Sequence, residues 1–425
     1  MIISKYKQNI KLFFLILLII GNSGYMLQVA DKDFNRIISA ITLLSGAIIG
    51  INLLTKKIMI NRMEYRVVLS FIILNIFSML GNLEISIIYF KYIALVLIAF
   101  YFVQQQTTEK ISELFVNVML ILSIISLLFM LITVFYGEFT PISIVSTENS
   151  KVKYYNYLIF FKPNLLTNLI FRNQGVFWEP GLYASYLLIA MMLEINFSRN
   201  IKIWKIIILI ITLFTTLSTA GILMLSLIIL LYVERFIKKK YMYYLFVLAV
   251  MTIVIIGYFF KDNIIQYLVE FNPRLFFKLL SNETTKMTRL YAPLLNLFIF
   301  LENPIFGAGY IGATEIFQLE KMKYYIDSQT STNFYMLAAL GTFGVLYTVW
   351  WLKSIFMNKS FSIITKIGIF LLIFIILNKE PHNELLLTWV ILFLLIKKRE
   401  ENYYIHKRNK KLLINEVKIK LEKKR

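Results

Sequence analysis

The chain has 425 residues, of which 59% are hydrophobic and 16% are charged, and its formal net charge is +21. Charged residues make up about a quarter of an ordinary soluble protein, so this composition excludes that class and indicates a polytopic membrane protein. The sequence has no cysteine and 2 histidines, which excludes a disulfide framework and a thiolate or histidine metal cluster. Any chemistry must therefore come from Arg, Lys, carboxylates, Tyr and hydroxyl groups.

Apolar runs long enough to cross a hydrocarbon core of roughly 30 Å as helices recur along the chain. We therefore predict an all-α integral membrane protein with about twelve transmembrane helices. The predicted spans are 11–28, 37–54, 67–81, 84–103, 115–136, 181–197, 203–218, 220–237, 242–260, 333–352, 361–378 and 384–396. Helices 1–5 fall within residues 1–136, helices 6–9 within 181–260 and helices 10–12 within 333–396.

Lysine and arginine gather in the short connections "TKKIMINRMEYR", "NFSRNIK", "ERFIKKK" and "KSIFMNK" and in the tail 397–425. Short basic connections stay in the cytoplasm. This distribution predicts a multi-pass protein of the cytoplasmic (inner) membrane with both termini in the cytoplasm. The basic cytoplasmic tail is expected to rest on anionic membrane lipids rather than to bind nucleic acid.

The same topology places two longer loops outside the cytoplasm, a medium one at 137–180 and a large one at 261–332. The medium loop ends in "FRNQGVFWEPGLY", in which Arg172, Trp178 and Glu179 precede Pro180. A plain helix start at a lipid interface explains this motif without any function, because Pro suits the first turn and an acid suits the positive helix end. A functional site at the mouth of the span is the alternative.

The large loop contains "TRLYAPLLNLFIFLENPIFGAGY", which joins Arg289 to a turn that runs from Glu302 to Tyr310. Gly307 and Gly309 in this turn allow backbone conformations and close approaches that residues with a Cβ resist. No GKS or GKT follows the glycines, so they are weak evidence for a phosphate loop.

These motifs occur in order with a "STAG" turn between two spans and with "STNFYMLAALGTFG", in which Asn333 opens the tenth span. Over residues 165–350 the set resembles the O-antigen ligase and polymerase family of bacterial polysaccharide assembly. The resemblance implies a glycosyltransferase that acts on oligosaccharides linked to a polyprenyl diphosphate at the outer membrane face. Where many ligases have His-Asn, this chain has Thr332-Asn333, which favours the polymerase branch.

By this resemblance, Arg172 and Arg289 correspond to the two arginines of the family motifs. A guanidinium donates two parallel hydrogen bonds to phosphate oxygens, so both are expected to stabilise the leaving diphosphate. Glu179 is the first candidate for the proton acceptor, Glu302 the second and His382 the third. The expected substrate-binding residues are Trp178, Asn333, Gly307, Gly309 and Tyr310.

Neither long loop has a DxD pair, so we expect glycosyl transfer without a metal or another cofactor. The expected partners are a lipid-linked oligosaccharide, membrane lipids, a chain-length regulator and a flippase. Two alternatives stay open, a ligase-type transferase and a lipid-linked oligosaccharide flippase or other transporter. A transporter would carry charges near the midplane of its spans, whereas here Lys91 and Glu194 are the main exceptions to apolar spans.

Overall fold

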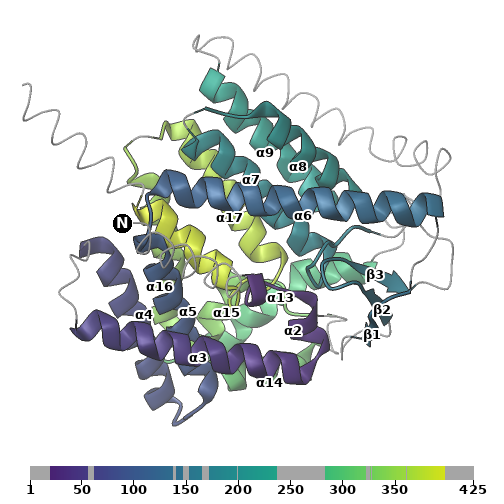
Figure 1. Ribbon diagram of the computed structural model, residues 1–425. Helices are drawn as coiled ribbons and strands as arrows, with labels where there is room; N and C mark the ends of the chain where they lie inside the picture. The colour runs from purple at the N-terminus through teal and green to yellow at the C-terminus, as the bar shows by residue number, and fades with distance from the viewer. Residues whose placement is uncertain are drawn as a thin grey trace, which may run out of the picture.

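The computed structural model describes residues 20–55, 62–136, 140–146, 153–164, 172–198, 200–236, 283–321, 326, 328–359 and 361–397 (Figure 1). The structure is mostly helical (76%) and has a small sheet. Within the described ranges, six helical stretches are long and apolar enough to cross a membrane. They are α3 (Lys32–Thr55), α4 (Arg62–Gly81), α5 (Ile87–Gln104), α6 (Thr108–Tyr136), α7 (Pro180–Phe197) and the stretch formed by α15 (Thr332–Leu340), η1 (Gly341–Gly344) and α16 (Val345–Phe356).

The other helices are shorter or more polar. They are α2 (Met26–Ala30), α8 (Ile203–Thr215), α9 (Thr219–Phe236), α13 (Glu283–Glu302), α14 (Gly309–Glu320), α17 (Ile363–Lys379) and a last helix, Leu386–Lys397. The first half of the predicted span 11–28 lies outside the described residues, and the span 242–260 lies wholly outside them. The prediction of a helical membrane-type chain is confirmed, and the count of twelve spans stays a prediction.

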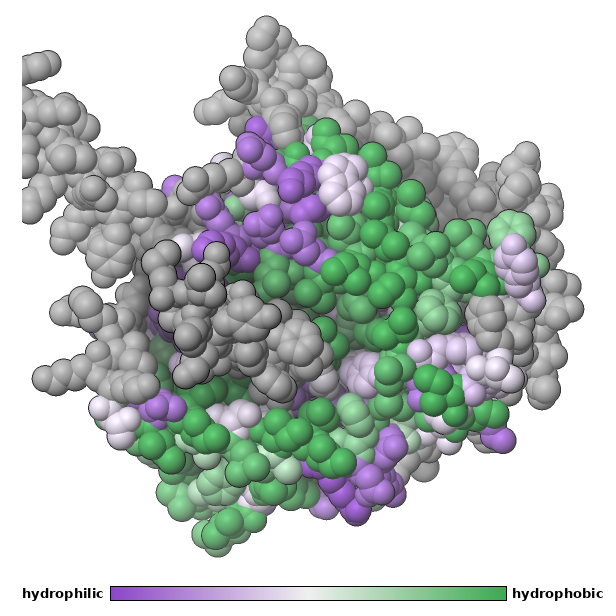
Figure 2. Space-filling model, viewed as in Figure 1, coloured by the Kyte–Doolittle hydropathy of each residue, from purple (hydrophilic) through white to green (hydrophobic). Residues whose placement is uncertain are grey.

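Apolar side chains cover much of the outer surface of the long helices. On α3 the exposed side chains include Ile37, Leu44 and Ile51, which are 58%, 65% and 62% exposed. Figure 2 shows a mostly hydrophobic surface over α6, with hydrophilic residues in separate patches. Large exposed apolar surfaces mark contact with lipid or with other proteins.

Helix α7 is the centre of the bundle. All of its residues except Asn196 are buried, and it packs against α6, α8, α9 and α17. A helix that is hydrophobic on all sides belongs in a core. Pro180 occupies its first turn, where a missing N–H removes no helical hydrogen bond. The start of α7 is therefore held in the interior, directly after the motif that contains Arg172.

Three short antiparallel strands lie within the first predicted loop, β1 (Ser143–Ser146), β2 (Lys153–Asn156) and β3 (Phe161–Asn164). The all-α prediction is wrong at this point. The backbone N–H of Phe161 donates to Gly175 O at 3.0 Å, and its ring meets Tyr25 edge-on at 5.8 Å. Ladder hydrogen bonds join the three strands. Packing of their aromatic and β-branched side chains against neighbouring residues adds to the stability of the sheet.

Part of the second predicted loop is helical, because α13 and α14 both pack against α15. The turn between α13 and α14 packs against η1, the short 3-10 helix that interrupts the tenth predicted span. There Thr342 donates to Pro304 O through its backbone N–H and its hydroxyl, both at 2.7 Å. Gly307 has a φ of 72°, and a Cβ at this position would overlap the carbonyl group of Ala339. Close packing thus explains a glycine at 307.

The helix ends that adjoin short basic connections, as far as the structure describes them, lie at the end of the bundle opposite to the start of α7. Arg235, at the end of α9, donates to Ser198 O just beyond the end of α7 at 2.7 Å. Lys397, at the end of the last helix, donates to Val103 O near the end of α5 at 2.7 Å. The polar loops before α7, before α15 and after α17 therefore share the other end.

Replacement of Gly307 by Ala should destabilise the protein, because the new methyl group meets backbone atoms and a positive φ is unfavourable for alanine. We expect a loss of more than about 1 kcal/mol, visible as a lower thermal midpoint in detergent. Gly312→Ala is the matched control, since the nearest atom to its new Cβ would be the Cβ of Ala308 at 3.7 Å. Equal midpoints for the two variants would contradict this account of the turn.

Candidate functional site

The end of α17 and the loop after it, residues 378–384, form a polar segment beside the start of α7. Lys379, Glu380 and His382 in this 378–384 segment are 4%, 4% and 1% exposed. Burial of charged groups is costly unless they are paired or hydrogen-bonded. Perturbed, buried titratable groups gather at functional sites more often than elsewhere, so this segment is the leading candidate for one.

Two charged side chains of the segment meet the first turn of α7. The ammonium of Lys379 donates to Gly181 O and to Ser218 Oγ, both at 3.0 Å. The carboxylate of Glu380 lies against Gly181, where a Cβ would overlap its Oε1. The free N–H groups and positive dipole end of a helix N-terminus favour a nearby carboxylate. A glycine at 181 is therefore required for this approach.

The start of α15 holds the backbone of the segment from another direction. Ser331 Oγ donates to Asn378 Oδ1 at 2.6 Å, and Thr332 Oγ1 donates to Glu380 O at 3.3 Å. The backbone N–H of His382 in turn donates to Thr332 Oγ1 at 2.8 Å. Thr332 thus holds the backbone of the 378–384 segment from both sides of Pro381.

The far part of the segment is tied to α5. Asn383 Nδ2 donates to the hydroxyl of Tyr92 at 2.6 Å, and Glu384 forms an ion pair with Lys91 at 2.8 Å. Lys91 was one of the two ionisable exceptions within the predicted spans. Lys91 is therefore paired with Glu384 at this end of the bundle, next to the candidate site.

Arg172 lies close to the same site. Its Nε donates to Thr216 O at 3.1 Å, in the turn between α8 and α9 that continues into the "STAG" sequence. Asn173 anchors the chain here, because its backbone N–H donates to Thr215 O at 3.0 Å. Lys379 donates to Ser218 in the same turn. One predicted cation, Arg172, and one that the sequence reasoning missed, Lys379, thus donate to the same turn.

Trp178 and Glu179 occupy the approach to α7. The backbone N–H of Trp178 donates to Gly24 O at 3.0 Å, and its ring is half-buried. Glu179 is the N-cap residue of α7 and is also half-buried, and its side chain makes no capping hydrogen bond. Both residues therefore border the cluster formed by Arg172 and the 378–384 segment.

The remaining predicted residues divide into two groups. Arg289 lies in α13, and its side chain is outside the described part of the chain. Glu302 is exposed at the end of α13, beside the turn that packs on η1. This position associates Glu302 with the α13–α14 turn rather than with the start of α7.

Gly309 and Tyr310 begin α14 next to the loop between α4 and α5. A Cβ on Gly309, whose φ is 72°, would overlap Oε2 of Glu84. Tyr310 is buried and stacks on Tyr92 with ring centroids 4.2 Å apart. Burial raises the pKa of Glu84, whose carboxylate also accepts a hydrogen bond from the backbone N–H of Ile311. Packing and helix capping therefore explain the residue types at 309 and 310.

Several buried polar atoms at this end have no hydrogen-bond partner among the described residues. They are Gln174 Nε2, Thr330 Oγ1, Asn333 Nδ2 and His382 Nε2. An unmatched buried polar atom costs about 1 to 3 kcal/mol, so such atoms usually face a water molecule or a polar ligand. Asn333 was predicted to bind substrate, and its open amide donor is consistent with that prediction.

His382 is held as a neutral ring. Its Nδ1 lies 3.2 Å from Thr388 Oγ1, and the ring of Tyr186 meets it edge-on at 6.2 Å. Burial, and secondarily the positive charge of Lys379, lowers the pKa of His382 to about 3.

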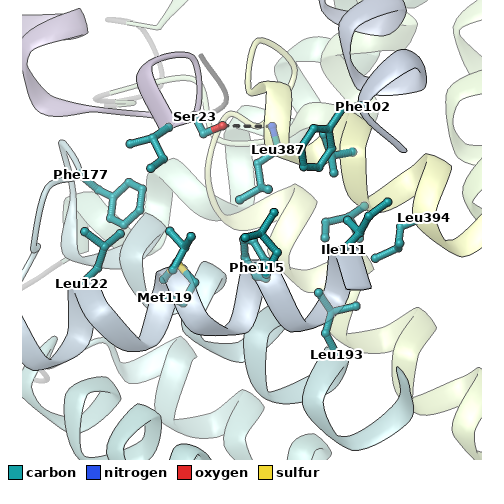
Figure 3. A pocket seen from close by; sticks show the side chains of 15 residues that line it. Ser23, Phe102, Ile111, Phe115, Met119, Leu122, Phe177, Leu193, Leu387 and Leu394 are labelled. Atoms are coloured by element: carbon teal, nitrogen blue, oxygen red, sulfur yellow. Dashed lines mark hydrogen bonds between the residues drawn. The ribbon is translucent and has the colours of Figure 1, made fainter. Parts of the chain in front are cut away.

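An apolar pocket lies between α5, α6, α7 and the last helix (Figure 3). Its lining runs along α6 from Ile111 to Leu122 and includes Leu193 of α7 and Leu394 of the last helix. Ser23 is the polar residue in the lining. Ser23 Oγ accepts a hydrogen bond from the backbone N–H of Leu387 at 3.1 Å, as Figure 3 shows. Its carbonyl accepts one from the hydroxyl of Tyr186 at 2.9 Å, so the pocket begins next to the residues that surround His382.

The sequence matches no protein-family model and no curated protein. Sequence reasoning selected Arg172, Glu179 and His382 near this cluster but overlooked Lys379 and Glu380. The available signal was the dense polar loop "NKEPHNE" between two predicted spans.

The buried neutral His382 should make the protein less stable in mild acid. Below pH 6.5 the unfolded chain binds a proton that the folded state, with a pKa of about 3, does not. Its contribution is therefore fully present above pH 6.5 and is lost as the pH falls, by about 2 kcal/mol at pH 5.

Thermal midpoints at pH 7.5 and pH 5 measure this effect. We expect the midpoint of the native protein to fall more than that of His382→Gln. If His382→Gln and the native protein lose the same amount, His382 does not titrate as described.

Proposed function

We propose that the protein is a membrane-embedded glycosyltransferase that polymerises oligosaccharide repeat units carried on a polyprenyl diphosphate, at the outer face of the cytoplasmic membrane. The observation that carries the proposal is that two cations, Arg172 and Lys379, both donate hydrogen bonds to the turn between α8 and α9, and that Lys379 also donates to Gly181 O in the first turn of α7. Cations of this kind suit an anionic group such as a diphosphate. The product would be an O-antigen, capsule or exopolysaccharide.

The chemistry requires stabilisation of the diphosphate that leaves the anomeric carbon. Arg172 suits this task, because its planar guanidinium stays charged and matches phosphate oxygens. The resemblance to the ligase and polymerase family assigns a second phosphate-binding role to Arg289. With these cations in place, the transfer is expected to proceed without a metal, and direct attack on the anomeric carbon would invert its configuration.

The apolar pocket supports a lipid-linked substrate. A polyprenyl diphosphate joins a hydrocarbon chain to a charged group, and the protein has an apolar pocket that Ser23 and Tyr186 link to His382 of the polar segment. Burial of each CH₂ group of such a chain contributes about 0.8 kcal/mol. A flippase that delivers the lipid and a chain-length regulator are the proposed protein partners.

The positions of ionisable residues favour transfer over transport. Lys91, near the start of α5, forms an ion pair with Glu384. Glu194, near the end of α7, accepts hydrogen bonds from Ser198 Oγ at 3.1 Å and from the backbone N–H of Lys202 at 2.8 Å. Transporters use charges near the midplane of their spans, whereas these two charges lie near helix ends and stabilise local structure. A ligase-type transferase remains the closest alternative, with Thr332 in place of histidine as the feature that favours a polymerase.

Purified protein in lipid vesicles should convert a polyprenyl-diphosphate-linked repeat unit into a ladder of longer chains on gels. We expect the same chains in excess chelator, since the cations of the site replace a metal. Loss of chain growth in chelator, with recovery on addition of magnesium, would contradict the metal-free mechanism. Transfer to a different acceptor, without chain growth, would support the ligase alternative.

Replacement of Arg172 by Ala should lower the rate of chain growth by about 100- to 1,000-fold, the effect typical of one lost preorganised donor. Arg172→Lys should restore little, because lysine keeps the charge but loses the planar fork. Arg36→Ala is the matched control, because Arg36 is exposed and contacts Asp33 on the surface of α3. Normal chains from Arg172→Lys would show that Arg172 only anchors the helix start at the lipid interface.

A further inference from the structure

Three carboxylates compete for the role of proton acceptor in the proposed reaction, and their positions differ. Glu302 is exposed beside the α13–α14 turn, and Glu179 is half-buried at the N-cap of α7. Glu380 is 4% exposed and lies against Gly181 in the first turn of α7. We propose that Glu380 accepts the proton of the attacking hydroxyl group, an inference that rests on the proposed glycosyl transfer.

The position of the Glu380 carboxylate is set by its surroundings. The missing Cβ of Gly181 leaves the space that Oε1 occupies, and Lys379 Nζ lies 3.3 Å from the same Cβ position. The ammonium of Lys379 is itself fixed by Gly181 O and Ser218 Oγ. A neighbouring ammonium and a helix N-terminus both favour the negative charge that a proton acceptor needs.

The backbone at Glu380 is held independently of its side chain. Thr332 Oγ1 donates to Glu380 O at 3.3 Å and accepts from His382 N at 2.8 Å, while Ser331 bonds Asn378 on the other side. The loop therefore keeps its path when the carboxylate is exchanged for an amide of the same shape. This makes Glu380→Gln a test of charge and proton transfer rather than of folding.

The proposed step balances as a single displacement. A sugar hydroxyl oxygen forms the new bond to the anomeric carbon of the donor, while the bond from that carbon to the diphosphate oxygen breaks. The bonding electrons leave with the diphosphate, whose charge Arg172 stabilises. The hydroxyl proton passes to the carboxylate of Glu380, which Lys379 positions, and is then released to solvent. No oxidant, reductant or further reactant is required.

The test measures chain growth and donor binding for Glu380→Gln in lipid vesicles. General base catalysis contributes about 100- to 10,000-fold, so the rate should fall within that range. Binding of the lipid-linked donor should change less than threefold, and the acidic limb of the pH–rate profile should disappear. Glu179→Gln should lower the rate less than tenfold, and exposed Glu113→Gln on α6 should match the native protein.

Two results would overturn the inference: Glu380→Gln at more than a tenth of the native rate, or a loss explained by weaker donor binding with an unchanged pH profile. If Glu380→Gln fails to fold, Glu380→Asp is the second variant to test, because its side chain keeps the charge but is one methylene group shorter. That variant should fold, bind donor and lose rate, and full activity from it would count against the role. If the native protein makes no chains, the proposed function fails instead, which separates the two claims.

Discussion

The burial of Lys379 and Glu380 beside the first turn of α7 is the constraint on which this end of the bundle depends. Two ions removed from water cost several kcal/mol each unless close partners compensate them. Compensation for Lys379 comes from Gly181 O and Ser218 Oγ, so the end of α17, the start of α7 and the α8–α9 turn must meet at one place. Because nearly all of α7 is buried, these three elements meet in the interior of the bundle.

Neighbouring elements then fix the cluster from separate directions. The small sheet reaches the segment before α7 through the bond from Phe161 to Gly175, and α15 clamps the polar loop through Thr332. The ion pair of Lys91 with Glu384 adds α5. Sites held by several rigid elements keep their geometry through a reaction. A preorganised cationic site is what the proposed transfer from a diphosphate lipid requires.

Much of the helical framework could be predicted, because a long apolar run must form its hydrogen bonds internally when it leaves water. The sheet at 143–164 and the α13–α14 hairpin could not. Their strands and helices are short, and contacts such as Ala308 N to Ala338 O, distant in sequence, stabilise them. For the site, sequence motifs led to Arg172 and Glu179. Lys379 was passed over because a lysine at a helix end is normally a solvated or interfacial residue.

The sequence by itself determined the membrane-type composition, the succession of helices and the separation of basic connections from polar loops, since each follows from local hydropathy and charge. The tertiary structure alone decided which polar residues meet. Gly181, Ser218, Thr332 and Glu380 come from four distant parts of the chain. They converge because the buried charges of the 378–384 segment need partners that only the packing of α7, α9 and α15 around it supplies.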